Sequence, residues 1–470
     1  MPVRRWACGF VTIALATTAW AWGVDVQGAP ATRGAAMSPP PVLVSQVTTD
    51  PDVASGEAWV VTDPRDPQEV AVVWLATRDA TDPTKLANGS GYCGMARSSD
   101  GGRTWSSTKQ LPFRLTTAGG PISDVQSNTG TVPICGDPVA GVGPDGTLYA
   151  AAAMVGSPSW TQGITSVDHG WSWTEPKEIF GVDQLAAAAI GNPGHKTPAI
   201  GMGRAYMAVD PVTGEISVHS QEDAGVEGRF ISVSSDHGAT WSTPRPLDPD
   251  IQSSSAGAHS AAGGTIAVAY VVDPSSATYR ASPSPAVTCA ATCTVFETTA
   301  DHGATWSRHV MPVQGVPGSK IVAADPSHPG RFAVLLTTNS GRNIEVWVTD
   351  DIGNNWTRTN VLTAAAGESL IKPWVAYSPN GTLGAVWRTQ YPDGSTNVSA
   401  ITSRDGGTSF SEVVPLTTTR VPPDTGVGPG DDCACNVHLD ATTLSATWAN
   451  RRSGQRQIYF GRFDYTTLAQ

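Results

Sequence analysis

Charged side chains are scarce in this sequence of 470 residues, where Asp, Glu, Lys and Arg together make up 15%. Basic residues are the scarcer sign, with 29 Lys and Arg against 41 Asp and Glu, so the formal net charge is −12. A chain this acidic lacks the basic surface that binds phosphate backbones or anionic membranes. We therefore expect no nucleic acid partner.

Long hydrophobic runs are absent after the first 21 residues, so no membrane span is expected in the rest of the chain. Arg4 and Arg5 precede a short apolar stretch over residues 6–19, and Ala19-Trp20-Ala21 fits a signal-peptidase site. This pattern predicts a signal peptide over residues 1–21, followed by a flexible Pro- and Ala-rich linker over 22–41. Export by the general or the twin-arginine route stays open. We expect a secreted or cell-surface monomer.

Cysteine is also sparse, with seven copies, of which Cys8 would leave with the signal peptide. An exported chain permits disulfides, and the spacing of the other six suggests local pairs. Zinc binding is the alternative, but these spacings do not match known zinc motifs, so we predict no metal and no cofactor. The expected pairs are Cys93–Cys135, Cys289–Cys293 and, in a small strained ring, Cys433–Cys435.

Glycine, proline and tryptophan are plentiful, which is typical of short strands joined by tight turns. One pattern, Asp-x-Gly-x-(Thr/Ser/Asn)-aromatic, occurs six times at intervals of 50 to 68 residues. Each interval holds about four short strands, the content of one propeller blade. The six aspartates that begin the pattern are Asp100, Asp168, Asp236, Asp301, Asp351 and Asp405.

The chemistry of this pattern is that of a turn. Its Asp can accept hydrogen bonds from backbone N–H groups, its Gly supplies a positive φ, and its aromatic ring fills the space beside the strands. The repeats resemble Asp boxes, the BNR repeats of sialidases and of the wider Asp-box propeller superfamily. The resemblance implies an all-β propeller with each repeat between the third and fourth strands of a blade. We interpret the six aspartates as structural.

Alternation of apolar residues predicts the first two strands of each blade. First strands are expected at Ala58–Thr62, Pro138–Val142, Ala205–Val209, Ser260–Ala262, Ile321–Ala324 and Trp374–Tyr377. Second strands are expected at Val70–Leu75, Thr147–Ala152, Glu215–His219, Thr265–Val271, Arg331–Leu336 and Thr382–Trp387.

Three further strands follow the sixth repeat, at Val437–Leu439, Leu444–Trp448 and Ile458–Phe463, and no repeat follows them. Val42–Thr48 is a lone strand at the other end. Joining it to these three completes a seventh blade, closes the ring and removes an exposed edge pair. We predict a seven-bladed β-propeller over 42–470; six blades with a terminal extension is the alternative.

Ligands are expected on the face opposite the repeats, where the first strands converge on the central channel. Glu57, Asp137 and Lys372 stand at the starts of first strands, and with Arg342 they are the candidate ligand-binding residues. A solvated channel rim is the alternative interpretation. Further rim positions are Lys196, His259, Lys320, Asp431, Asp432 and His438.

A second cluster follows the second strands, where a Trp is closely followed by Arg. Arg78, Arg388 and Arg451 come from neighbouring blades and could together bind a carboxylate. With Tyr391 and Asp393, which follow Arg388, they are the candidate catalytic residues. The alternative is that the Arg belongs to the repeat and packs on a ring.

The resemblance to sialidases is incomplete, because the Phe/Tyr-Arg-Ile-Pro motif that carries their first arginine is missing. Three functions stay open: a sialidase-like glycoside hydrolase with a rearranged site, a non-catalytic propeller that binds glycans or cell-surface proteins, and an assembly factor. Exposed aromatics such as Trp160 and Tyr279 would favour a binding module.

Overall fold

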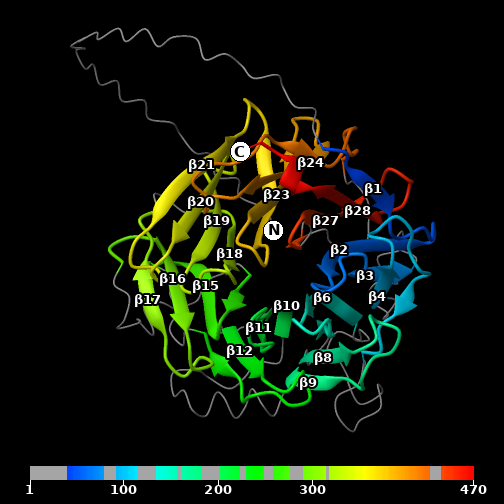
Figure 1. The fold of residues 1–470 in the computed structure, drawn as a ribbon, viewed down its shortest axis with the longest axis horizontal. Coiled ribbons are helices and arrows are strands. Elements are labelled where there is room, and N and C mark those ends of the chain that lie inside the picture. Colours follow the sequence, from blue (N-terminus) through cyan, green and yellow to red (C-terminus); the bar gives the residue numbers. More distant parts are fainter. Residues whose placement is uncertain are drawn as a thin grey trace, which may run out of the picture. The chain divides into compact units, whose positions relative to one another are not determined.

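Seven four-stranded antiparallel sheets follow one another around a ring in this computed structural model (Figure 1). The seven-bladed, all-β propeller predicted from the sequence is confirmed. The structure describes residues 40–78, 91–113, 134–155, 160–181, 202–222, 229–247, 258–275, 289–313, 317–423 and 436–469. The predicted signal peptide, most of the linker and the Cys433–Cys435 pair lie outside them. In the described part of the chain no helix is long and apolar enough to cross a membrane.

Six blades each use four consecutive strands, numbered from the channel outward. Blade 1 consists of β2 (Val53–Thr62), β3 (Val70–Arg78), β4 (Gly91–Ser98) and β5 (Lys109–Gln110). Blade 2 consists of β6 (Ile134–Val142), β7 (Leu148–Val155), β8 (Trp160–Ser166) and β9 (Lys177–Phe180). Blade 3 consists of β10 (Met202–Val209), β11 (Ile216–Glu222), β12 (Arg229–Ser234) and β13 (Arg245–Pro246). Blade 4 consists of β14 (Ser260–Ala262), β15 (Thr265–Val272), β16 (Cys293–Thr299) and β17 (Ser307–Val310). Blade 5 consists of β18 (Lys320–Ala324), β19 (Phe332–Thr338), β20 (Asn343–Thr349) and β21 (Thr357–Thr363). Blade 6 consists of β22 (Ser369–Tyr377), β23 (Leu383–Gln390), β24 (Thr396–Ser403) and β25 (Val414–Pro415).

The seventh blade joins the two ends of the described chain. Its strands, from the channel outward, are β26 (Val437–Leu439), β27 (Thr443–Asn450), β28 (Gln457–Asp464) and β1 (Leu43–Gln46). In Figure 1, β1 lies beside β28 where the blue and red ends of the ring meet. The side chain of Gln457 donates to the backbone oxygens of Asp50 and Val53, which ties β28 to the start of blade 1.

The middle strands of each blade are buried on both faces, because neighbouring blades cover them. Strand β19 is an example: all its residues are buried, and they are Ala, β-branched, Leu or Phe side chains. Trp160, expected as an exposed loop aromatic, begins β8 and is 1% exposed, so that expectation is wrong. Tyr279 lies outside the described residues.

Each of the six repeats forms the hairpin between the third and fourth strands of its blade, which we call a repeat hairpin. In the hairpin after β12, the Asp236 carboxylate accepts hydrogen bonds from the Thr240 N–H at 2.9 Å and from the Thr240 and Ser234 hydroxyls at 2.5 and 2.9 Å. The Ser234 hydroxyl also accepts the Gly238 N–H at 2.9 Å. The Ser or Thr two residues before the Asp therefore belongs to the repeat, although the sequence analysis missed it.

The same bonds hold the carboxyls ionised in acid. The Thr104 hydroxyl, the Thr104 N–H and the Ser98 hydroxyl bond to Asp100 and lower its pKa to about 2. In Asp301 the Thr305 hydroxyl and N–H and the Thr299 hydroxyl do the same, again to about 2. A carboxyl with a lowered folded-state pKa stabilises the fold above its ordinary pKa and loses that contribution as pH falls through the lowered value.

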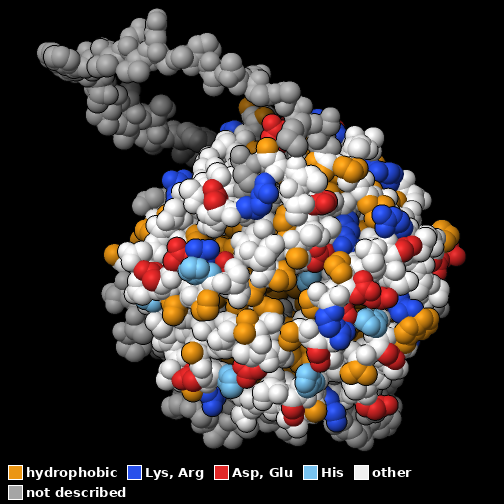
Figure 2. Space-filling view, in the orientation of Figure 1, with side chains coloured by type: hydrophobic (Ala, Val, Ile, Leu, Met, Phe, Trp, Pro, Cys, Tyr) orange, Lys and Arg blue, Asp and Glu red, His pale blue; other side chains and the backbone are white. Residues whose placement is uncertain are grey.

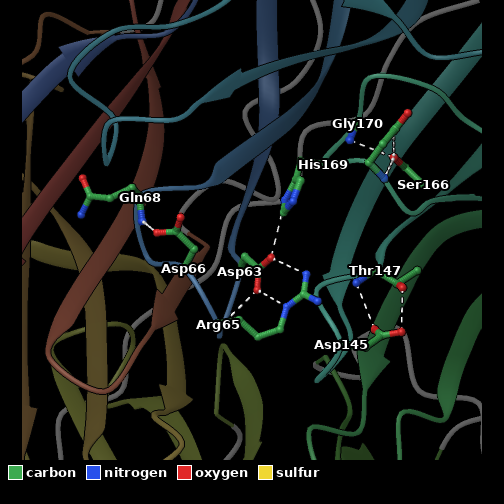
Figure 3. Close-up of polar contacts among 10 residues, drawn as sticks. Asp63, Arg65, Asp66, Gln68, Asp145, Thr147, Ser166, His169 and Gly170 are labelled. Carbon is green, nitrogen blue, oxygen red and sulfur yellow. Dashed lines mark hydrogen bonds and ion pairs between the residues drawn. The ribbon is translucent and has the colours of Figure 1, made fainter.

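Consecutive blades are tied together where a repeat hairpin meets the first turn of the blade before it. His169 Nδ1 lies 3.5 Å from Asp63 Oδ2, and the Arg65 side chain donates to the same carboxylate at 2.9 Å (Figure 3). His302 Nε2 lies 2.9 Å from Glu215 Oε1 in the corresponding place two blades on. The repeat hairpins and the turns between first and second strands therefore share one face, which we call the hairpin face.

Two of the expected disulfides are confirmed. Cys93–Cys135 joins β4 of blade 1 to β6 of blade 2, with 5.6 Å between their Cα atoms. Cys289–Cys293 lies immediately before and at the start of β16. The first bridge fixes the two blades whose first strands carry Glu57 and Asp137.

Replacing Asp236 with Ala should lower the melting temperature by roughly 2 °C, because two or three hydrogen bonds of its hairpin are lost. Thermal unfolding at pH 7 measures this, with the exposed neighbour Ser235→Ala as the matched control. Since hydrogen bonds from Thr240 lower the pKa of Asp236, the difference should shrink as pH falls below 3.8. A difference that persists unchanged in acid would contradict the structural role of this carboxylate.

Replacing Gly102 with Ala tests the closure of the ring. At Gly102, φ is +89° and an added Cβ would sit 2.2 Å from Phe460 of blade 7. Gly264 is the control, with φ +81° and nothing within 4 Å of the added Cβ. We expect Gly102→Ala to lower the free energy of unfolding by roughly 1–3 kcal/mol more than Gly264→Ala. Equal losses in denaturant titrations would show that Phe460 does not hold blade 1 against blade 7.

Candidate functional site

The first strands run toward the hairpin face, so their starting residues meet at the opposite end of the channel, which we call the mouth. Three of the four predicted ligand-binding residues lie near it, three or four residues into their strands and not at the strand starts expected from the sequence: Glu57 in β2, Asp137 in β6 and Lys372 in β22. They come from the first, second and sixth blades; the first and second are neighbours, and the seventh blade separates the first from the sixth. The fourth, Arg342, follows β19 and donates through Nη2 to the Ala364 oxygen at 2.9 Å.

All three mouth residues occupy the same unusual backbone position. The ladder between first and second strands shifts register around each of them, between Gly56 and Trp59, Gly136 and Val139, and Ile371 and Trp374. Their φ angles are 54° for Glu57, 46° for Asp137 and 51° for Lys372. Left-handed backbone in a non-glycine residue is costly, and bulges of this kind re-aim side chains next to active sites.

Glu57 and Asp137 meet at the mouth through one hydrogen bond. Glu57 is buried, and its Oε2 accepts the backbone N–H of Asp137 at 3.2 Å, so blade 1 holds the bulge of blade 2 in place. Asp137 itself is half-buried, so it is the more accessible of the two carboxylates. This pair could orient a hydroxylated ligand or exchange a proton with it.

Cationic groups lie on the neighbouring blades. Arg388 is 7% exposed and pairs in register with Ile371, the residue before Lys372. Lys320 begins β18 in blade 5, is also buried and donates to the Pro317 oxygen at 3.2 Å. Positive and negative groups therefore approach the mouth from different sides, which suits a polar ligand with an anionic substituent.

The other predicted arginines stand at the ends of second strands. Arg78 ends β3, and its side chain is outside the described part of the structure. Arg451 follows β27 and is half-buried. Trp74, Trp387 and Trp448, which precede the three arginines in the sequence, are at most 1% exposed in the blade cores. The shared Trp is therefore a packing feature, and a joint carboxylate site of the three arginines stays a prediction.

Tyr391 and Asp393 form a tight turn after β23. The Asp393 carboxylate accepts the Ser395 N–H and hydroxyl at 2.9 and 2.6 Å, and these bonds, with Arg420 beside them, lower its pKa. The Arg420 guanidinium stacks 3.5 Å above the Tyr391 ring, and Asn397 donates to the Tyr391 hydroxyl at 3.1 Å. Their catalytic role stays a prediction.

Two predicted rim histidines lie deeper than expected. His259 and His438 line a pocket of about 470 Å³ inside the channel. Burial lowers the pKa of each to about 4, so both are neutral at pH 7. Lys196, Asp431 and Asp432 lie outside the described residues. Across the described ranges, no three His, Cys, Asp or Glu side chains gather so that they could hold a metal ion.

The strain at the mouth had only a faint signal in the sequence. A glycine precedes Glu57 and Asp137, and a proline follows Asp137 and Lys372. Gly and Pro within a strand often mark bulges. These residues were selected for their charges, and the neighbouring Gly and Pro residues were not interpreted as bulge signals.

No protein-family model matches the chain. Among curated proteins, it is similar to an anhydrosialidase of Macrobdella decora, with 29% identity over 126 residues. That match covers 25% of this chain and only 16% of the relative.

Among solved structures, a Dyadobacter fermentans protein of unknown function has 15% identity and a TM-score of 0.49, over 90% of this chain and 99% of that one. The Hadza microbial sialidase Hz136 has 15% identity and a TM-score of 0.46, over 85% and 78%. The endosialidase of phage phi92 has 12% identity and a TM-score of 0.46, over 90% and 69%.

Replacing Lys372 with Gly should separate stability from ligand binding. Glycine adopts a φ of 51° without strain, so we expect the melting temperature to stay the same or to rise by roughly 2 °C. Binding at the mouth should be lost with the ammonium group. Asn339→Gly is the control, since Asn339 also has a positive φ but lies in the turn after β19. A large fall in melting temperature would mean that Lys372 is there for the fold.

Proposed function

We propose that this chain is an exported, sialidase-like Asp-box propeller that acts on carbohydrate at the mouth of its channel. The carrying observation is the set of three strained, charged residues, Glu57, Asp137 and Lys372, at equivalent bulges in the first strands of blades 1, 2 and 6. Backbone strain of roughly 1–3 kcal/mol at each position needs a compensating role. Binding a ligand is a role that all three share.

The chemistry of the mouth suits an acidic sugar. Lys372 and the buried Arg388 supply positive charge for a carboxylate. The half-buried Asp137 is the proposed acid/base group, and Glu57 positions it by accepting its N–H at 3.2 Å. The similarity to a protein named anhydrosialidase supports this class of substrate. Hydrogen bonds from fixed charged groups provide both orientation and transition-state stabilisation.

A non-catalytic glycan-binding or assembly propeller is the second candidate. It is favoured by the turn after β23, where the carboxylate of Asp393 is occupied by Ser395 and the ring of Tyr391 is covered by Arg420. A nucleophilic Tyr is activated by an adjacent base. The Tyr391 side chain contacts the Asn397 amide and the Arg420 guanidinium, which do not serve as bases.

Export is part of the proposal. The signal-peptide pattern over residues 1–21 and the two disulfides support an oxidising, extracellular compartment. The ligand is then a glycan or a cell-surface partner, met by a monomeric propeller.

The test is fluorophore release from an aryl sialoside and a small panel of other aryl glycosides by purified residues 22–470. Asp137→Asn and Arg388→Ala should lower turnover on the order of 10²-fold or more. Asp145→Asn is the matched control, because Asp145 belongs to the same blade but lies on the hairpin face. Tyr391→Phe and Asp393→Asn examine the site predicted from the sequence.

If the Asp137 and Arg388 variants lose turnover and Asp145→Asn keeps it, the chain is a glycosidase with its site at the mouth. Loss confined to Tyr391→Phe and Asp393→Asn would move the site to the turn after β23. Absence of turnover on every substrate would refute the hydrolase and leave the binding module, which a glycan array would then examine.

A further inference from the structure

The cavity that His259 and His438 line extends along the channel to the turns of the hairpin face. First strands of all seven blades line its volume of about 470 Å³. The lining residues include Trp59 and Trp374 of first strands, and others lie in the turns after the first strands. Five of these turns contribute a proline to the opening: Pro64, Pro144, Pro211, Pro326 and Pro379.

Aromatic side chains of three blades form a layer in the channel beside this cavity. Trp59 of blade 1 meets Trp374 of blade 6 edge to face, with ring centroids 4.9 Å apart. Trp374 in turn stacks on Tyr206 of blade 3 at 6.5 Å. Each Trp stands two residues after a mouth residue, Glu57 or Lys372, and neither of these charged residues lines the cavity. The layer therefore separates the cavity from the mouth.

The wall of the cavity is mostly apolar and carries little net charge. Ala, Val, Pro and Trp side chains make up most of it. The carboxylate of Asp440, which also lines it, is held by the Arg462 guanidinium at 2.9 Å. Figure 2 views the ring from the side with exposed histidines, and hydrophobic side chains gather around its middle while charged ones lie farther out.

Within the described ranges, two buried polar atoms of lining residues have no hydrogen-bond partner. These are Asn436 Oδ1, in a side chain 3% exposed, and the Tyr377 hydroxyl, in a side chain 8% exposed. An unpaired buried polar group costs roughly 1–3 kcal/mol. The polar residues that line the cavity include His259, Ser260 and His438. A largely apolar pocket with a few polar groups is the usual form of a small-molecule site.

We propose that this cavity binds a small, uncharged, largely apolar molecule with one hydrogen-bonding group, independently of the glycan site. Its volume fits one such molecule, since ligand pockets span roughly 300–1,000 Å³. The apolar wall excludes an acidic sugar.

Titration calorimetry with 2-naphthol tests the site, and 2-naphthalenesulfonate serves as the charged analogue with the same ring system. Ala208→Phe places a ring in the cavity and should weaken 2-naphthol binding at least about tenfold. Val212→Arg alters the rim without disturbing the core, because Val212 is 57% exposed, and should weaken binding severalfold. Val167→Arg is the matched control, since Val167 is 82% exposed and does not line the cavity.

Saturable binding of 2-naphthol that both cavity variants weaken and Val167→Arg leaves unchanged would support the site. Binding that is absent, or equal in all four proteins, would overturn it. Equal affinity for the sulfonate would overturn the requirement for an uncharged ligand. Displacement of 2-naphthol by a sialoside, or its loss in Lys372→Gly, would overturn the separation from the mouth.

Discussion

Closure of the ring by β1 is the constraint on which the rest of the structure depends. Strand β1 adds the outer edge of blade 7, and the Trp105 indole of blade 1 donates to the Ser45 hydroxyl of β1 at 2.9 Å. In a closed ring each blade is held by two neighbours, so the starts of the first strands have fixed relative positions. Only then can Glu57 of blade 1 accept the N–H of Asp137 of blade 2.

Contacts between blades on the hairpin face hold the ring rigid, so strained backbone at the mouth is tolerated. On the hairpin face, repeat hairpins and His–carboxylate contacts such as His169–Asp63 tie consecutive blades. At the mouth, left-handed Glu57, Asp137 and Lys372 use part of that stability. The aromatic layer of Trp59, Trp374 and Tyr206 lies between the two regions. One channel can therefore hold a charged site at one end and an apolar cavity at the other.

The fold was predictable because its signals are local and repeated. Six copies of Asp-x-Gly with a following aromatic residue mark six blades, and the strand pattern after residue 436 gave the seventh. Each of the two confirmed disulfides joins cysteines that are consecutive in the sequence, so their pairing was predictable. The Ser or Thr before each repeat Asp was missed, because its hydroxyl acts through backbone bonds such as Ser234 with Gly238.

The site was harder to predict because it depends on geometry that the residue types do not encode. Glu57, Asp137 and Lys372 were chosen for charge and position, but the bulges that distinguish them are tertiary features. His259 and His438 were expected at the rim, but they are buried and line the channel cavity. The burial of Trp160 reflects packing between blades that no local pattern shows.

The most direct measurement is hydrogen–deuterium exchange of the mature chain with and without a saturating sialoside. The account predicts that protection appears at the three bulges, in peptides covering residues 53–57, 134–137 and 369–372, and not in the turns of the hairpin face. Protection confined to those turns, or none at saturating sialoside, would contradict a carbohydrate site at the mouth.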